Sequence, residues 1–93
     1  MTDKKYDNFQ IICGKWKPLI IFNLYNGRKR FTELLIVTEG ISQKVLCENL
    51  ASLEKHNLVD KEHFYEYPPR VEYFLTSKGY EYARVLKGFE NIV

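Results

Sequence analysis

Polar side chains follow Ser42 at the start of a predicted amphipathic helix, where they could read the edges of base pairs. Gln43 and Lys44 come directly after Ser42, and Cys47 lies one turn further along. Gln43 can pair bidentately with adenine, Lys44 can donate to guanine or to a phosphate, and Cys47 can touch a thymine methyl group. The backbone N–H groups after Ser42 also suit a phosphate. For an arbitrary helix, a merely solvated polar face would be the preferred interpretation of the same residues.

Basic residues are concentrated between Gly14 and Arg30, a segment that contains no acidic residue. The basic side chains in it are Lys15, Lys17, Arg28, Lys29 and Arg30. The formal net charge of the chain is only +2, so the uneven distribution is more informative than the total. We expect a distinctly positive part of the surface, at which some of these side chains contact a polyanion and the others are simply solvated.

Two adjacent prolines mark an exposed hairpin tip at residues 66–69, because proline cannot take part in a paired strand ladder. Tyr67 lies in this tip, and Arg70 follows it. An arginine at such a tip suits a narrow minor groove or its phosphates. A cross-strand ion pair between Arg70 and Glu72 or Glu66 is an alternative of nearly equal weight.

Catalytic and metal-binding patterns are absent from the sequence. His56, His63, Cys13 and Cys47 are potential metal ligands, but they lack the paired spacing of a metal site. No glycine-rich phosphate loop, catalytic carboxylate motif or nucleophile elbow occurs, and 93 residues leave little room for a substrate pocket. We therefore expect no metal, no cofactor and no enzymatic activity.

The elements that would position these residues begin with two predicted helices. Phe9 and Ile12 indicate a first short helix, and Pro18 suits the first turn of a second one. The second helix is apolar nearly all round, which predicts burial, and Gly27 supplies the left-handed residue that ends it. An extended piece at residues 30–31 should follow.

Capping signals then define two further helices. Thr32 is the predicted N-cap of a short helix that precedes the break at Gly40. Ser42 is the predicted N-cap of the next helix, at about residues 42–55, with Ile41 and Leu46 spaced as a hydrophobic staple. Asn57 is expected to end this helix. The periodicity of this helix leaves a polar outer face formed by Lys44, Cys47, Glu48, Ala51 and Lys55.

Two strands and a last helix complete the chain. Residues 58–65 and 70–76 are rich in β-branched and aromatic side chains, which indicates strands, and the wing between them spans about residues 64–71. A final helix begins at Thr76 or Ser77. The whole is an α+β fold, mainly α: a winged helix-turn-helix with a two-stranded wing and a C-terminal dimerisation helix. Apolar residues expected at a dimer interface are Phe9, Ile12, Tyr82, Leu86, Phe89 and Val93.

The size and composition fit one domain, at residues 1–93. Hydrophobic residues make up 45% and charged residues 28%, which is ordinary for a chain that folds. The longest apolar run is too short to span a membrane, and the first residues lack a signal-type apolar core, so we expect a cytoplasmic protein with reduced thiols.

Five segments, specific in combination, occur in the order found in one family of regulators. They are residues 14–21 (GKWKPLII), 30–34 (RFTEL), 40–46 (GISQKVL), 50–54 (LASLE) and 67–79 (YPPRVEYFLTSKG). In these segments the sequence resembles the HxlR-type helix-turn-helix family, winged-helix regulators related to the MarR group. The resemblance covers about residues 9–90 and favours base recognition over a merely solvated face for Gln43 and Lys44.

The resemblance implies a homodimer that binds double-stranded DNA at a pseudo-palindromic operator and represses or, less often, activates nearby genes. Ser42, Gln43, Lys44 and Cys47 would enter the major groove, and the wing would lie on the minor groove or backbone. Phosphate contacts would come from Lys15, Lys17, Lys29 and Arg30.

Two departures from the family concern cysteine. Some members carry an N-terminal sensor cysteine, which residues 1–12 lack, whereas Cys13 replaces a usual glycine and Cys47 a frequent threonine. A thiol or ligand sensor that also binds DNA, with Cys13 or Cys47 as its switch, is one alternative. A winged helix whose outer face docks on a protein is another.

Overall fold

The computed structural model describes residues 14–92, with side chains through residue 88. Its elements are α2 (Trp16–Tyr25), α3 (Phe31–Val37), α4 (Gln43–Lys55), β1 (Val59–Phe64), β2 (Arg70–Leu75) and α5 (Ser77–Ile92). This order confirms the predicted winged helix-turn-helix. The short helix expected around Phe9 and Ile12 lies outside the described residues.

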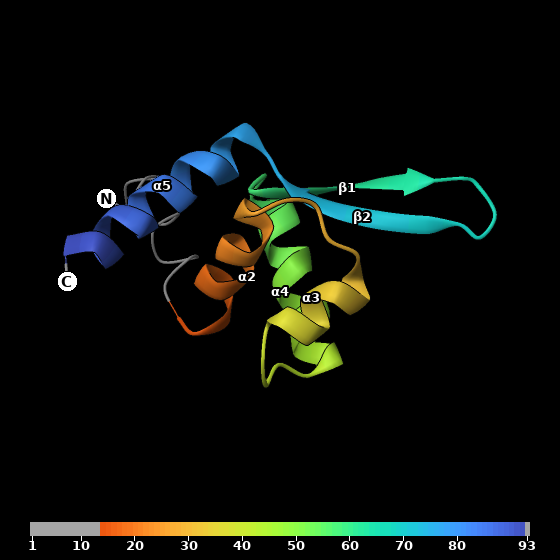
Figure 1. The fold of residues 1–93 in the computed structure, drawn as a ribbon, viewed down its shortest axis with the longest axis horizontal. Helices are drawn as coiled ribbons and strands as arrows, with labels where there is room; N and C mark the ends of the chain where they lie inside the picture. Colours follow the sequence, from red (N-terminus) through yellow and green to blue (C-terminus); the bar gives the residue numbers. More distant parts are fainter. Residues whose placement is uncertain (1–13, 93) are drawn as a thin grey trace.

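The three helices α2, α3 and α4 pack together, while the β1–β2 hairpin projects from them on one side and α5 extends on the other (Figure 1). One core holds these elements together. Its buried members are Ile20, Ile21, Leu24, Leu34, Ile41, Leu46, Leu50, Leu53, Leu58, Val59, Leu75 and Ala83. Because every element contributes to this core, the hairpin and the helices are fixed relative to one another at their bases.

The helix α2 is buried or half-buried except at Leu19, which corrects the expectation of burial nearly all round at that one position. Ile20, Ile21 and Leu24 are fully buried, but Leu19 remains 42% exposed. Gly27 ends the helical segment with a φ of 138°, as predicted for a left-handed residue.

The hairpin is an antiparallel pair in which Val59 faces Leu75 and Phe64 faces Arg70. Lys29 adds a bridge at the other edge of β2: its N–H donates to the Tyr73 carbonyl at 3.1 Å, and its carbonyl accepts from the Tyr73 N–H at 2.8 Å. The extended piece predicted at residues 30–31 is thus centred on Lys29.

Thr32 is not the N-cap of α3, contrary to the prediction from its residue type. The helix begins at Phe31, and Arg30 is the N-cap, with φ −78° and ψ 163°. The N–H of Arg30 donates to the Glu33 carboxylate at 2.7 Å. The bridge at Lys29 is the physical reason, since the backbone leaves the sheet immediately after it and turns into a helix one residue later.

The start and end of α4 confirm the local signals in the sequence. The Ser42 hydroxyl accepts a hydrogen bond from the Val45 N–H at 3.2 Å. Ile41 and Leu46 are both buried, as a hydrophobic staple requires. Asn57 follows the helix with a φ of 62°, which turns the chain into β1.

The segment directly after α4 is joined to the start of α5 by hydrogen bonds that involve Thr76. The Thr76 hydroxyl donates to the Asn57 carbonyl at 2.6 Å and accepts from the Gly79 N–H at 3.0 Å. The Thr76 N–H donates to the Leu58 carbonyl at 3.1 Å. The backbones are so close that a β-carbon on Gly79 would lie 2.1 Å from the Leu58 carbonyl oxygen. Only glycine allows this approach without a backbone shift.

Gly79→Ala should therefore lower the free energy of unfolding by about 1–3 kcal/mol, the usual cost of forcing an atom into a packed site. Gly88→Ala in the same helix is the matched control, because a β-carbon there meets nothing within 4 Å. That change should raise stability by roughly 0.5–1 kcal/mol through helix propensity. Urea unfolding measures both, and equal effects at the two positions would contradict the close contact.

Candidate nucleic-acid interface

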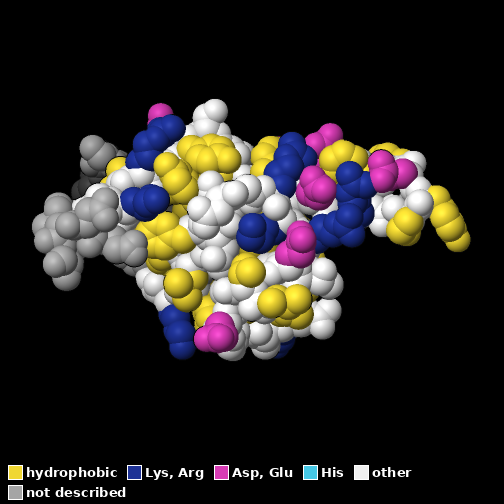
Figure 2. All heavy atoms as spheres, viewed as in Figure 1, with side chains coloured by type: hydrophobic (Ala, Val, Ile, Leu, Met, Phe, Trp, Pro, Cys, Tyr) yellow, Lys and Arg dark blue, Asp and Glu magenta, His cyan; other side chains and the backbone are white. Residues whose placement is uncertain are grey.

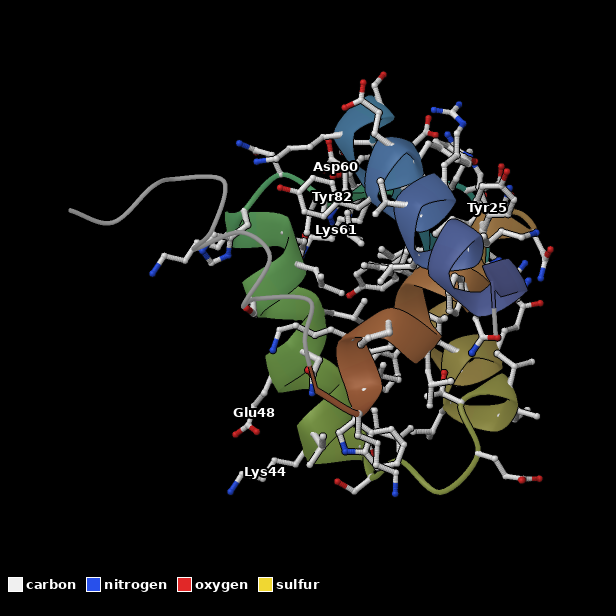
Figure 3. All side chains as sticks on the ribbon, turned by 90° about the vertical axis from the view of Figure 1, so that its left-hand side faces the viewer. Tyr25, Lys44, Glu48, Asp60, Lys61 and Tyr82 are labelled. Carbon is white, nitrogen blue, oxygen red and sulfur yellow. The ribbon has the colours of Figure 1, made fainter. Side chains whose placement is uncertain are left out.

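The outer face of α4 is exposed from its first turn to its last. Leu46, Leu50 and Leu53 turn inward to the core, so the opposite side of the helix is left to solvent. The exposed residues on it are Gln43, Lys44, Cys47, Glu48, Ala51 and Lys55. Figure 3 shows Lys44 and Glu48 pointing away from the rest of the molecule. The polar face predicted from the periodicity is confirmed.

Ser42, Gln43 and Lys44 occupy the N-terminal end of this face. Ser42 caps the helix and is itself exposed. No side-chain hydrogen bond from Gln43 or Lys44 occurs within residues 14–88. Cys47 is a free, exposed thiol in the next turn. The structure thus brings together, on one rigid element, the four residues predicted to enter the major groove; their contact with DNA stays a prediction.

Of the five basic residues between Gly14 and Arg30, Arg28 pairs with a glutamate of the hairpin, and within the described residues the other four do not. Lys15 and Arg30 are exposed, and Lys17 and Lys29 are half-buried. The Lys15 ammonium lies 4.7 Å from the centroid of the Trp16 ring. Arg28 instead joins the hairpin, since its Nη1 lies 2.6 Å from the Glu62 carboxylate.

Arg70 forms ion pairs with both glutamates of the alternative prediction, although Glu72 lies on the same strand as Arg70 and not across from it. Its Nε donates to Glu72 Oε2 at 3.1 Å, and its Nη1 pairs with Glu66. The hydrogen bond from Arg70 is the main cause that lowers the pKa of Glu72 below its ordinary value. The same bond raises the pKa of Arg70. The Tyr67 side chain at the tip is 99% exposed.

The role of Arg28 was missed by sequence reasoning, which placed it only in a basic segment. Its Nη1 also lies 3.5 Å from Glu72, and its guanidinium carbon lies 4.4 Å from the centroid of the Phe74 ring. The only signal in the sequence was that Glu62 and Glu72 lie in two segments predicted to be strands. It became specific only with the register, in which Glu62 and Glu72 face each other.

The residues expected at a dimer interface are only partly within the described region. Tyr82 and Leu86 are half-buried and pack against the chain's own core, whereas Val85 beside them is 53% exposed. Figure 3 views this side of the molecule, with α5 in front. Phe9, Ile12 and Val93 lie outside the described residues, as does the side chain of Phe89.

Neither metal-binding nor membrane-spanning features occur in the described part of the chain. Within it, no three His, Cys, Asp or Glu residues are grouped so as to hold a metal ion. His63 stacks on Tyr65, and His56 Nδ1 lies 2.8 Å from the Ser52 carbonyl. None of the described helices is both long enough and apolar enough to cross a bilayer.

Comparisons with known proteins agree with this architecture. The chain is 38% identical over 78 residues to the HTH-type transcriptional regulator YkvN of Bacillus subtilis, an alignment of 84% of this chain and 66% of YkvN. It is 44% identical over 68 residues to an HTH-type regulator of Methanothermobacter thermautotrophicus, covering 73% of this chain and 52% of that protein. The chain thus spans about half to two thirds of the length of these relatives.

A solved structure gives the same result in three dimensions. The structure of diamide-treated YodB from Bacillus subtilis superposes with a TM-score of 0.89 at 35% identity, over 98% of this chain and 90% of YodB. The sequence model of the HxlR-like helix-turn-helix family matches residues 11–93. Its members are DNA-binding transcriptional regulators and not enzymes. The chain belongs to the HxlR-like helix-turn-helix family.

Proposed function

We propose that the protein represses transcription by binding a specific operator, with α4 in the major groove. One observation carries this assignment: α4 is capped, packed into the core on one side, and exposed along the whole of the other. A helix of this kind fits the major groove, where each base pair presents a distinct pattern of donors and acceptors. Gln43 and Lys44 read base edges, Cys47 meets a thymine methyl, and Ser42 meets a phosphate.

Phosphate contacts orient α4 on the duplex without reading sequence. Lys15 and Arg30 are exposed and therefore able to reach a phosphate, and Lys17 and Lys29 are half-buried, with long side chains that can extend from the surface. The tip of the wing supplies a further contact, because the ring of Tyr67 is almost wholly exposed beside two prolines.

Two copies of the chain read two half-sites of a pseudo-palindromic operator. A homodimer through α5 is supported by exposed Val85 next to Tyr82 and Leu86, and by the extension of α5 away from the wing (Figure 1). In such a dimer the two copies of α4 face the same side of the duplex, about one helical turn apart.

Gln43→Ala should cost about 1–3 kcal/mol of binding free energy at a preferred operator and relax the preference at one base pair per half-site. The physical reason is the loss of a bidentate contact to a base edge. Operators selected from random DNA, followed by mobility shifts with single-base variants, measure both effects. Lys55→Ala is the control, since Lys55 is exposed in the last turn of α4, far from its N-terminal end.

Unchanged base preference in both Gln43→Ala and Lys44→Ala would contradict the assignment of α4 as the reading helix. A wild type that binds no duplex DNA would favour a protein partner.

Lys15→Ala and Lys29→Ala should weaken binding to operator and to random DNA alike. Each change removes a phosphate contact, so the slope of log K against log salt should become shallower by about one to two units in a dimer. Lys87→Ala removes the same charge from α5, where the ammonium lies 4.8 Å from the Tyr25 ring centroid, and should leave the slope unchanged. Equal slopes for all three variants would exclude these phosphate contacts.

Val85→Asp should convert the dimer to a folded monomer, because it places a charge in the proposed apolar interface. Sedimentation velocity at micromolar concentration measures the change. Ile36→Asp is the matched control for Val85→Asp. Ile36 is 77% exposed on α3, so the same charge there should leave the dimer intact. A wild type that sediments as a monomer would refute assembly through α5.

A further inference from the structure

One face of the wing carries a continuous row of arginine, glutamate and phenylalanine side chains. Arg70 and Glu72 alternate along β2 with residues of the other face, so they project on the same side as Phe74. Phe64 and Glu62 of β1 are their cross-strand partners, opposite Arg70 and Glu72 respectively. Figure 2 shows the result as basic and acidic atoms interleaved along the projecting wing, with hydrophobic atoms at its tip.

Glu72 lies at the centre of this row and holds one arginine with each of its oxygens. Its Oε2 accepts from Arg70 Nε at 3.1 Å, and its Oε1 lies 3.5 Å from Arg28 Nη1. The outer ends of the two arginines are held as well, Arg70 by Glu66 and Arg28 by Glu62. Glu72 therefore links the wing to the segment directly after α2.

Each of the two guanidinium groups also lies over an aromatic ring. The guanidinium carbon of Arg70 lies 4.1 Å from the Phe64 ring centroid, and that of Arg28 lies 4.4 Å from the Phe74 centroid. Stacking on a ring and pairing with two carboxylates restrict a guanidinium group to one place. Neither arginine is free to turn toward a phosphate without first leaving these partners.

The charges of this row do not suit a phosphate-binding surface. Two arginines face three glutamates, Glu62, Glu66 and Glu72, so the row carries no net positive charge. A phosphate approaching Arg70 would meet two carboxylates at hydrogen-bond distance from the same side chain.

We propose that Glu72 is a positioning residue, which withholds Arg28 and Arg70 from the DNA backbone and fixes the angle of the wing. DNA contact by the wing is then left to its tip, where Tyr65 is 90% exposed and Tyr67 is 99% exposed. This assignment replaces the predicted phosphate or minor-groove contact of Arg70. It rests on the proposed function, because it concerns how the wing meets DNA.

Glu72→Gln tests the proposal, since glutamine keeps the size of the side chain but removes the one carboxylate charge that both arginines share. Random duplex DNA should bind about three- to tenfold more tightly at low salt, with the salt slope steeper by about two to four units in a dimer, as for two newly gained phosphate contacts in each chain. The ratio of operator affinity to random-DNA affinity should fall. Exposed ion pairs contribute little to stability, so the thermal midpoint should stay close to that of the wild type.

Two variants separate this mechanism from a simple change in net charge. Glu81→Gln removes the same charge from an exposed position on α5 and should change neither the slope nor the ratio. The double variant Glu72→Gln with Arg70→Gln should lose about half of the gain, because one of the two released arginines is then missing.

The outcomes distinguish a failure of this inference from a failure of the proposed function. A wild type that binds no duplex DNA would overturn the function, and the inference with it. A wild type that binds its operator, with Glu72→Gln indistinguishable from Glu81→Gln, would overturn the inference alone. A gain that persists unchanged in the Arg70→Gln background would do the same, since Glu72 would then act by repelling DNA and not by holding Arg70.

Discussion

The placement of α5 relative to the end of α4 depends on one close contact between backbones, at which Gly79 lies directly against the Leu58 carbonyl group. The Thr76 hydroxyl completes this contact by bonding both Asn57 and Gly79. It joins the segment directly after α4 to the first turn of α5. In the proposed dimer, α5 meets its partner while α4 reads DNA, so this junction would set the distance between the two reading helices.

Features that depend on a few neighbouring residues were predictable from the sequence. Gly27 and Asn57 lie at positive φ where helices end, and Ser42 caps α4, because each of these choices is made by local backbone sterics and hydrogen bonds. The prediction of Thr32 as an N-cap was wrong because a residue type alone cannot show at which residue the backbone leaves the sheet. The bridge from Lys29 to Tyr73 decides that point, and it joins residues far apart in the sequence.

The same distinction holds for the candidate interface. The outer face of α4 was predictable because apolar residues recur in the sequence with the helical period of 3.6 residues. The pairing of Arg70 with Glu72 was foreseeable because the two residues are close in sequence, but it was predicted across the hairpin, whereas both residues lie on β2. The partnership of Arg28 with Glu62 was not, since these residues are 34 positions apart and meet only through the strand register.

The separation of tasks within α4 has a consequence for how such a regulator diversifies. Its inward leucines hold the core, whereas Lys44, Cys47, Glu48 and Ala51 are exposed, and no side-chain hydrogen bond ties them to the rest of the described chain. Folding therefore places almost no selective constraint on these four positions. A duplicated copy of the gene could drift there toward a new regulatory target by single steps, each of them tolerated by the scaffold.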